Sequence, residues 1–298
     1  MRVPQQRPLS IFLFFLSVFS GCTYALEVHS HRLTSTLAQF IVWCPGAAAL
    51  CTCLLLRIPL GTLGWSWPPR RSLSLAYFLP LLYATPVYLL TWLIVRGSFT
   101  LKSFEVSMVE PYGLTRWAAF GTFGVALPLL FTVGVVFEAV WSLGEELGWR
   151  GFLFPRLQQR FGFHGACLIS GLIWAVWHFP ELLWTDFRPD TKPIFFLACF
   201  TVMVTALAYI MGYLRMRSGS LWPCVLLHAT HNTFIQSLFD PLTAPVGWAK
   251  YITTEFGVGL AVTVVVASTV LVSRGRLREG FSPAATDEPS SVRCTQCG

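Results

Sequence analysis

The chain has 298 residues, of which 54% are hydrophobic and 12% are charged, and its mean hydropathy is +0.61. Soluble domains contain about 25% charged residues, so this composition excludes a protein dissolved mainly in water. The formal net charge of +7 comes from basic residues scattered between apolar segments, a pattern that argues against nucleic acid as a partner. We therefore expect a membrane protein whose main surroundings are the lipid bilayer.

Eight apolar segments are long enough to cross a bilayer as helices, which takes about 20 residues for a hydrocarbon core of about 30 Å. They are residues 9–26, 37–56, 73–95, 117–141, 165–184, 193–214, 221–239 and 256–272. The sequence thus predicts an all-α fold, a polytopic bundle of about eight transmembrane helices. We expect residues 1–279 to form this single bundle and residues 280–298, rich in Pro, Ser and charge, to form a disordered cytoplasmic tail.

The first apolar segment has two interpretations. Two arginines precede a ten-residue apolar run over residues 11–20, and Gly21 and Cys22 follow it. This arrangement is typical of a cleaved signal peptide as well as of a first membrane helix. The sequence leaves both open.

The basic residues predict how the chain is oriented. With the N-terminus in the cytoplasm, 14 of the 21 Lys and Arg residues fall on the inner side and 7 on the outer side. We expect a multi-pass protein of the plasma (inner) membrane with both termini cytoplasmic. Residues 149–163 alternate large apolar side chains with Arg and Gln, which predicts a short amphipathic helix on the cytoplasmic surface.

Ionisable side chains within the predicted spans are the candidates for chemistry, because such groups usually face the bundle interior or a wet cavity. At the end of the fourth segment, Glu146 and Arg150 are four residues apart and can pair, which leaves Glu145 about 100° round the helix. A free carboxylate in a cavity of low dielectric suits a general base. The alternative is that both glutamates form structural ion pairs with Arg150.

Two histidine positions complete this group. His178 lies among aromatic residues in the fifth segment, where a lone histidine is more often a hydrogen-bonded core residue than a catalyst. In the seventh segment, His228 and Asn232 share a helix face, and His231 is adjacent to Asn232. Two neutral donors aimed at one point can stabilise an oxyanion, and an interhelical hydrogen bond is the alternative.

These residues resemble the CAAX prenyl protease and bacteriocin-processing (CPBP) family of intramembrane proteases, also called the Abi family. The EExxxR motif of that family matches Glu145, Glu146 and Arg150. Its second motif, an aromatic residue four positions before a histidine, matches Trp174 and His178, with Trp where Phe is usual. Its third motif, HxxxN, matches His228 and Asn232. The resemblance covers residues 141–239, with a weaker echo at residues 43–48.

The resemblance implies an endopeptidase that acts on a protein or peptide substrate at the membrane, lipidated or CAAX-like. The implied catalytic residues are Glu145 and His178, which would activate water, and His228 and Asn232, which would hold the oxyanion. The implied supporting residues are Glu146, Arg150, Trp174 and His231. Glu145, His178 and His228 would also suffice as ligands of a divalent metal such as zinc, so a metalloprotease and a metal-free, glutamate-dependent enzyme both remain open.

Two other functions fit the same residues. A non-proteolytic scaffold or immunity protein of this family would keep the polar cluster without the chemistry. A transporter with an ion or proton site would show inverted repeats, and the sequence has no apparent internal repeat. The protease interpretation requires Glu145 to lie level with His178, so its helix must start later than Trp117 or extend past the membrane edge. We expect it to start nearer Thr122, with a tilt that brings Glu145 level with His178.

Overall fold

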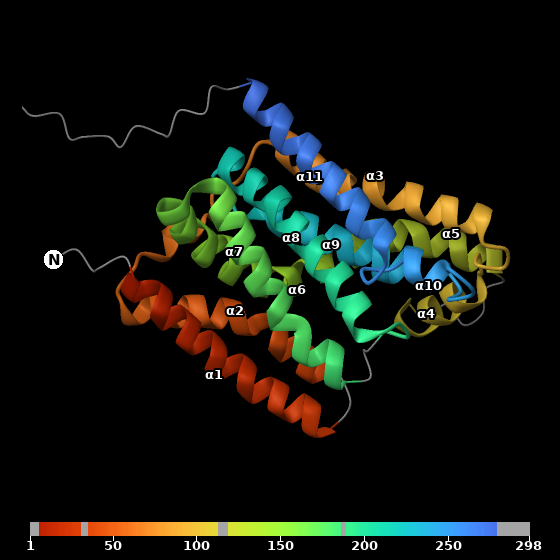
Figure 1. Cartoon of the computed structure of the whole chain (residues 1–298), viewed down its shortest axis with the longest axis horizontal. Coiled ribbons are helices and arrows are strands. Elements are labelled where there is room, and N and C mark those ends of the chain that lie inside the picture. Colours follow the sequence, from red (N-terminus) through yellow and green to blue (C-terminus); the bar gives the residue numbers. More distant parts are fainter. Residues whose placement is uncertain (1–5, 31–34, 113–118, 186–188, 279–298) are drawn as a thin grey trace, which may run out of the picture.

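The computed structural model describes residues 6–30, 35–112, 119–185 and 189–278, and its regular elements are helices (Figure 1). In chain order they are α1 (Gln6–Ser30), α2 (Ser35–Leu55), the 3-10 turn η1 (Leu60–Leu63), α3 (Arg70–Ile94), α4 (Lys102–Tyr112), α5 (Ala119–Leu129), the π-helical η2 (Leu130–Gly134), α6 (Val135–Glu146), the π-helical η3 (Leu147–Leu153), α7 (Phe154–Trp184), α8 (Pro193–Ser218), α9 (Trp222–Phe234), the π-helical η4 (Ile235–Phe239), α10 (Ala249–Ile252) and α11 (Val258–Arg278). Within the described ranges, β pairing is limited to one isolated bridge between Phe99 and Thr243.

The eight predicted apolar segments coincide with helices. The first, second and third segments form α1, α2 and α3, and the sixth and eighth form α8 and α11. The fourth segment forms α5, η2 and α6, which follow one another without a break. The fifth is the part of α7 after Gly162, where φ of 68° breaks the helix, and the seventh is α9 with η4. In the described part of the chain, six helical stretches are long and apolar enough to cross a membrane, and one of them, Phe123–Trp184, contains most of the fourth segment and all of the fifth. The chain is a multi-pass, all-α membrane protein.

The outer surface of the bundle is apolar. Leu93, Ile94 and Ile194 each expose 75 to 80% of their surface, and many further large apolar side chains lie on the outside of α1, α2 and α11. Water would penalise so much exposed hydrocarbon, whereas lipid tails solvate it. This surface therefore faces the bilayer.

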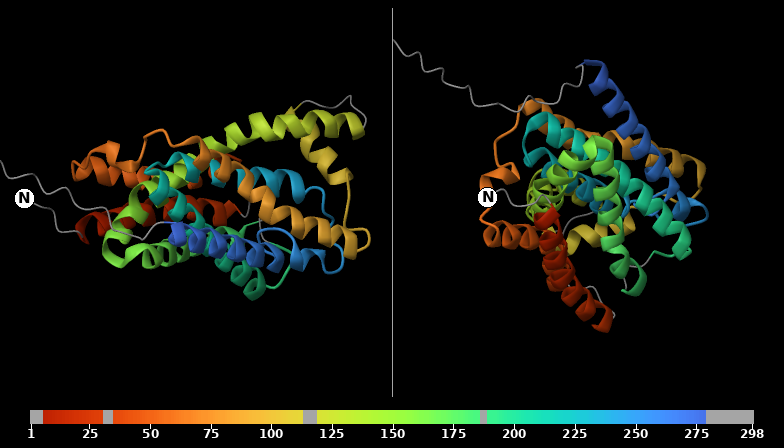
Figure 2. Two further views of the ribbon diagram at one scale, coloured as in Figure 1. Left: turned by 90° about the horizontal axis from the view of Figure 1, so that it is seen from above. Right: turned by 60° about the vertical axis from the view of Figure 1, so that its left-hand side comes forward.

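The helices alternate in direction along the bundle (Figures 1 and 2). The beginning of α1 and the end of α11 lie at one end, together with η1, and α4 and α10 lie at the other end. Among the long candidate spans, α8 is the most buried, whereas α1 and α11 are the least buried after the stretch Phe123–Trp184. It packs against α7 and α11, while α9 packs against α3 and α6. The core therefore lies between α6, α7, α8 and α9.

Helix α1 is hydrogen-bonded to the bundle. The Tyr24 hydroxyl donates to the carbonyl of Trp177 at 2.6 Å, and Trp177 Nε1 donates to the Ser20 hydroxyl at 2.7 Å. These contacts favour the membrane-helix interpretation of the first segment.

Glycines allow α2 and α6 to cross closely. Gly144 and Gly148 are four residues apart, a spacing that lets membrane helices approach through their backbones. A Cβ on Gly148 would lie 2.4 Å from Cβ of Pro45, and a Cβ on Gly46 would lie 2.5 Å from the Gly144 carbonyl oxygen. Residues 43–48, where the sequence weakly resembles the CPBP family, are thus the part of α2 that packs against the two glycines.

The helix that carries Glu145 is longer than expected. It is described from Ala119, three residues before the predicted start at Thr122, and it continues through η3 to Leu153. The predicted amphipathic surface helix is wrong in its first half, because Trp149, Arg150 and Phe152 are at most 1% exposed. The π-helical η3 extends α6 into the core, where Arg150 finds a carboxylate partner. The predicted tail lies outside the described residues, and the single-domain boundary at residue 279 stays a prediction.

Candidate active site

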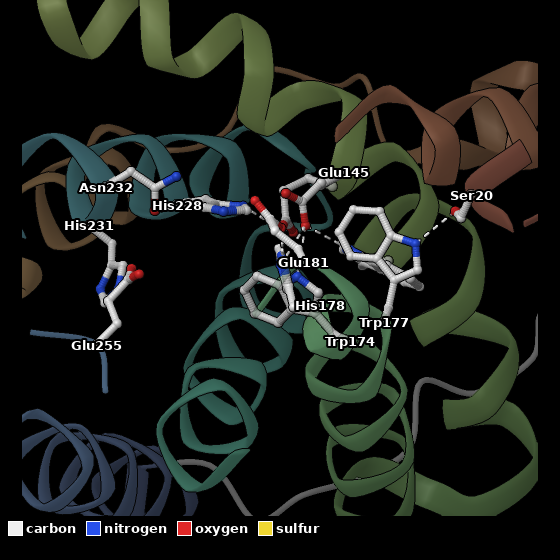
Figure 3. A network of polar contacts seen from close by, with 12 residues as sticks. Ser20, Glu145, Trp174, Trp177, His178, Glu181, His228, His231, Asn232 and Glu255 are labelled. Carbon is white, nitrogen blue, oxygen red and sulfur yellow. Dashed lines mark hydrogen bonds and ion pairs between the residues drawn. The ribbon is translucent and has the colours of Figure 1, made fainter. Parts of the chain in front are cut away.

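Six of the eight predicted site residues line one cavity of about 370 Å³ inside the bundle (Figure 3). Its lining includes Glu145 from α6, Trp174 and His178 from α7, and His228, His231 and Asn232 from α9. Glu146 and Arg150 lie outside the lining and are 0% and 1% exposed. Residues from three helices therefore meet where the sequence predicted a shared site.

Glu145 and His178 face each other across a short gap. Glu145 Oε2 is 3.9 Å from His178 Nε2, which is too far for a direct hydrogen bond but suits one bridging water. Two indole groups hold the carboxylate, because Trp174 Nε1 donates to Oε2 at 2.7 Å and Trp149 Nε1 at 3.1 Å. On the far side of the imidazole, Nδ1 is 3.3 Å from Glu181 Oε2. Since an ionised carboxylate only accepts hydrogen bonds, Glu181 favours the tautomer whose unprotonated Nε2 faces Glu145.

Glu146 connects Arg150 to His228. The pair expected from the four-residue spacing forms, with Arg150 Nη1 2.8 Å from Glu146 Oε1. The same oxygen is 3.0 Å from His228 Nδ1, which must carry the hydrogen. His228 can therefore donate from Nε2 into the cavity only as an imidazolium. This corrects the expectation of two neutral donors.

Asn232 is held by a carboxylate that was not among the predicted site residues. Its Nδ2 donates to Glu138 Oε1 at 2.8 Å. Because the carboxylate only accepts, it fixes which way the amide points and leaves the second N–H of the amide for another acceptor. The available signal was the spacing: Glu138 precedes Glu145 by seven residues, or about two turns, so both lie on one face of α6.

His231 belongs to a second cluster in the same cavity. Its Nδ1 is 2.6 Å from the Tyr83 hydroxyl of α3, and its Nε2 is 2.9 Å from Glu255 Oε1. Gln236 Nε2 also donates to both Glu255 oxygens at 3.2 Å. Sequence analysis missed Glu255, since a single carboxylate just before an apolar segment carries no motif.

The three candidate metal ligands are not arranged as a metal site. Across the parts of the chain that the structure describes, no group of three or more His, Cys, Asp or Glu side chains is placed to hold a metal ion. A catalytic zinc takes three protein ligands and a water. The donors as placed do not fit such a site.

A comparison with known proteins identifies a related family for this part of the chain. Residues 123–234 match the family model described as Type II CAAX prenyl endopeptidase Rce1-like. The predicted family resemblance is confirmed. The segment matched by the CAAX endopeptidase model contains all eight predicted site residues and Glu138, whereas Glu255 lies beyond it.

The chain is also similar to the CAAX prenyl protease 2 of Methanococcus maripaludis. The two are 50% identical over 36 residues, which make up 12% of this chain and 13% of that relative. So short a match says nothing by itself about the substrate of this chain. At the family level, the CAAX endopeptidase resemblance supports a protease in the membrane.

Proposed function

We propose that this protein is an intramembrane endopeptidase that hydrolyses a peptide bond in a lipidated, CAAX-like segment of membrane-associated proteins, using water activated by Glu145 and His178. One observation carries the proposal. A carboxylate and an imidazole nitrogen face each other 3.9 Å apart in a cavity within apolar helices, next to His228 and Asn232. Polar groups from three helices are tolerated within a membrane bundle where they serve one site.

Water activation follows from the two acceptors. A water between Glu145 Oε2 and His178 Nε2 donates one hydrogen to each, which turns an oxygen lone pair toward the substrate carbonyl carbon. As the new C–O bond forms, the carboxylate takes the proton. Glu181 keeps the imidazole in the required tautomer, the role that an orienting carboxylate plays in catalytic triads.

The carbonyl oxygen of the substrate becomes an oxyanion in this step. The proposal assigns its two donors to Nε2 of an imidazolium at His228 and to the free N–H of Asn232. Glu146 and Glu138 hold these donors at 3.0 and 2.8 Å before substrate arrives. Donors fixed in advance stabilise the developing charge without reorganising during the reaction.

Collapse of the tetrahedral intermediate completes the reaction. The C–N bond breaks, and the proton held by Glu145 passes to the leaving nitrogen. The products are a carboxylic acid and an amine, and Glu145 returns to its ionised form. The new acid then gives its proton to the amine, so the products leave as a carboxylate and an ammonium group. Atoms and charge balance without a metal ion.

The proposed setting is the plasma (inner) membrane with both termini cytoplasmic. The beginning of α1 and the end of α11 lie at the same end of the bundle, which supports placing both termini on one side. The excess of basic residues predicted on that side supports the cytoplasm. A protein substrate anchored by a lipid in the inner leaflet then reaches the cavity from the bilayer.

The test uses the full chain in nanodiscs and a quenched peptide ending in a prenylated CAAX sequence. We expect the wild-type protein to release the C-terminal fragment and Glu145→Gln to abolish release. The matched control is Asp190→Asn, which makes the same carboxylate-to-amide change at an exposed position before α8. It should cleave at the wild-type rate.

Folding is checked by the thermal unfolding midpoint of each variant. If Glu145→Gln folds and still cleaves, the proposed chemistry is wrong. If the wild-type protein cleaves neither prenylated nor unprenylated peptides, the non-proteolytic scaffold becomes the better interpretation.

A further inference from the structure

The loop over residues 253–257, between α10 and α11, contributes one side chain, Glu255, to the lining of the active-site cavity. Its Glu255 lines the cavity and is 8% exposed, although it comes from outside the segment matched by the family model. Figure 3 shows Glu255 and His231 pointing toward each other beside Asn232. The loop therefore touches the helix that carries His228 and Asn232.

The contacts of Glu255 form a complete hydrogen-bond relay. The Tyr83 hydroxyl donates to His231 Nδ1 at 2.6 Å, and His231 Nε2 donates to Glu255 at 2.9 Å, an order that satisfies a neutral imidazole. Tyr83 is 4% exposed and lies outside the cavity lining, so its hydroxyl has no access to a substrate. The relay has the order of a catalytic triad but not its exposed nucleophile. Its effect is to fasten the loop to α9.

The opposite side of the loop leads to His178. The ring of Phe256 stacks on Phe200 with centroids 5.6 Å apart, and Phe200 meets the His178 imidazole edge to face at 5.5 Å. These rings are tightly packed, so a shift of the loop displaces the imidazole. One short loop thus reaches both halves of the site: it contacts α9 directly through Glu255, and it reaches His178 of α7 indirectly, through Phe256 and the α8 residue Phe200.

The backbone of the loop is held in an unusual conformation. Thr254 has φ of +66°, which is uncommon for a β-branched residue, and its N–H donates to the Tyr88 hydroxyl at 3.1 Å. Tyr88 in turn donates to Asp240. A Cβ on Gly257 would lie 2.1 Å from the Thr253 carbonyl oxygen. Strain of this kind persists only where surrounding contacts enforce it.

We propose that Glu255 is a positioning residue. Its hydrogen bond to His231 holds the loop against α9, and the ring contacts from Phe256 through Phe200 to His178 then set the distance between His178 and Glu145. The inference rests on the proposed peptidase function, because it assigns Glu255 a role in that reaction. Glu255 acts on the rate of the chemical step and not on substrate affinity.

The test compares Glu255→Ala with Glu255→Gln in the nanodisc assay. We expect Glu255→Ala to lower kcat about 10-fold, since a misplacement of 1 Å can cost about 100-fold. KM should stay within about twofold, which separates a positioning role from substrate binding. Glu255→Gln should restore most of the rate, because its amide oxygen still accepts from His231. Val258→Ala, at an exposed position on α11, is the control expected to match wild type.

Two further measurements keep the proposal testable if Glu255→Ala folds poorly. Phe256→Leu breaks the ring stack but keeps the relay, and it should lower kcat non-additively with Glu255→Ala. The imidazole ¹⁵N resonances of His178 should shift in both variants, a readout that needs no activity. Unchanged kcat and unchanged resonances would overturn the inference, as would an effect confined to KM. If Glu145→Gln is inactive in the same assay, either of these results would refute only the role of Glu255, and the peptidase proposal would still hold.

Discussion

Replacing Gly148 with alanine tests whether the glycine contact between α2 and η3 sets the position of Glu145. The added Cβ would lie 2.4 Å from Pro45 Cβ, 2.6 Å from Pro45 C and 2.7 Å from Pro45 O. These atoms belong to a rigid ring and to backbone, so they cannot rotate away. The helices must separate by about 1 Å to reach the 3.5–4.0 Å of normal carbon contacts. Overpacking of this size costs about 1–3 kcal/mol of stability.

The same separation carries Glu145, one turn earlier, away from His178. We expect kcat to fall about 100-fold in the peptide assay, together with a lower unfolding midpoint in nanodiscs. The matched variant is Gly151→Ala in the same π-helical segment, where the nearest atoms lie 3.4 Å or more from the new Cβ. It should keep wild-type activity and stability. Equal behaviour of the two variants would refute the close-packing argument.

Three other outcomes follow from the site. Glu138→Ala should lower kcat, and adding it to Asn232→Ala should cost little more, because Glu138 acts through the Asn232 amide; additive losses in a double-mutant cycle would contradict this. Trp174→Phe removes the indole N–H that donates to Glu145 at 2.7 Å and should lower kcat about 10-fold. The control Trp177→Phe removes the indole N–H that donates to Ser20 and should mainly lower stability. A larger loss of kcat in Trp177→Phe than in Trp174→Phe would refute the assignment. A strong chelator should leave the rate unchanged, and loss of activity that zinc restores would establish a metal site instead.

Local pattern was enough to find the spans and the three motifs. The length of an apolar run depends on neighbours in the chain, and the four-residue spacings of Glu146 with Arg150 and of His228 with Asn232 place side chains on one face of any helix. The ion pair between Glu146 and Arg150 follows from that spacing alone. Burial of residues 149–153 did not follow, because arginines alternating with aromatics look alike at a membrane surface and beside a buried carboxylate.

The amino-acid sequence by itself determined that this is an all-α membrane protein with polar residues in three helices, since hydropathy and helical spacing are properties of contiguous residues. Only the tertiary structure decided which carboxylate serves which polar group. Glu138 meets Asn232 across 94 residues, Glu146 meets His228 across 82, and Glu255 meets His231 across 24. These pairings depend on how closely glycines let α6 approach α2 and on how the helices cross. No short-range pattern records those distances, because they are set by side-chain volumes from opposite parts of the chain.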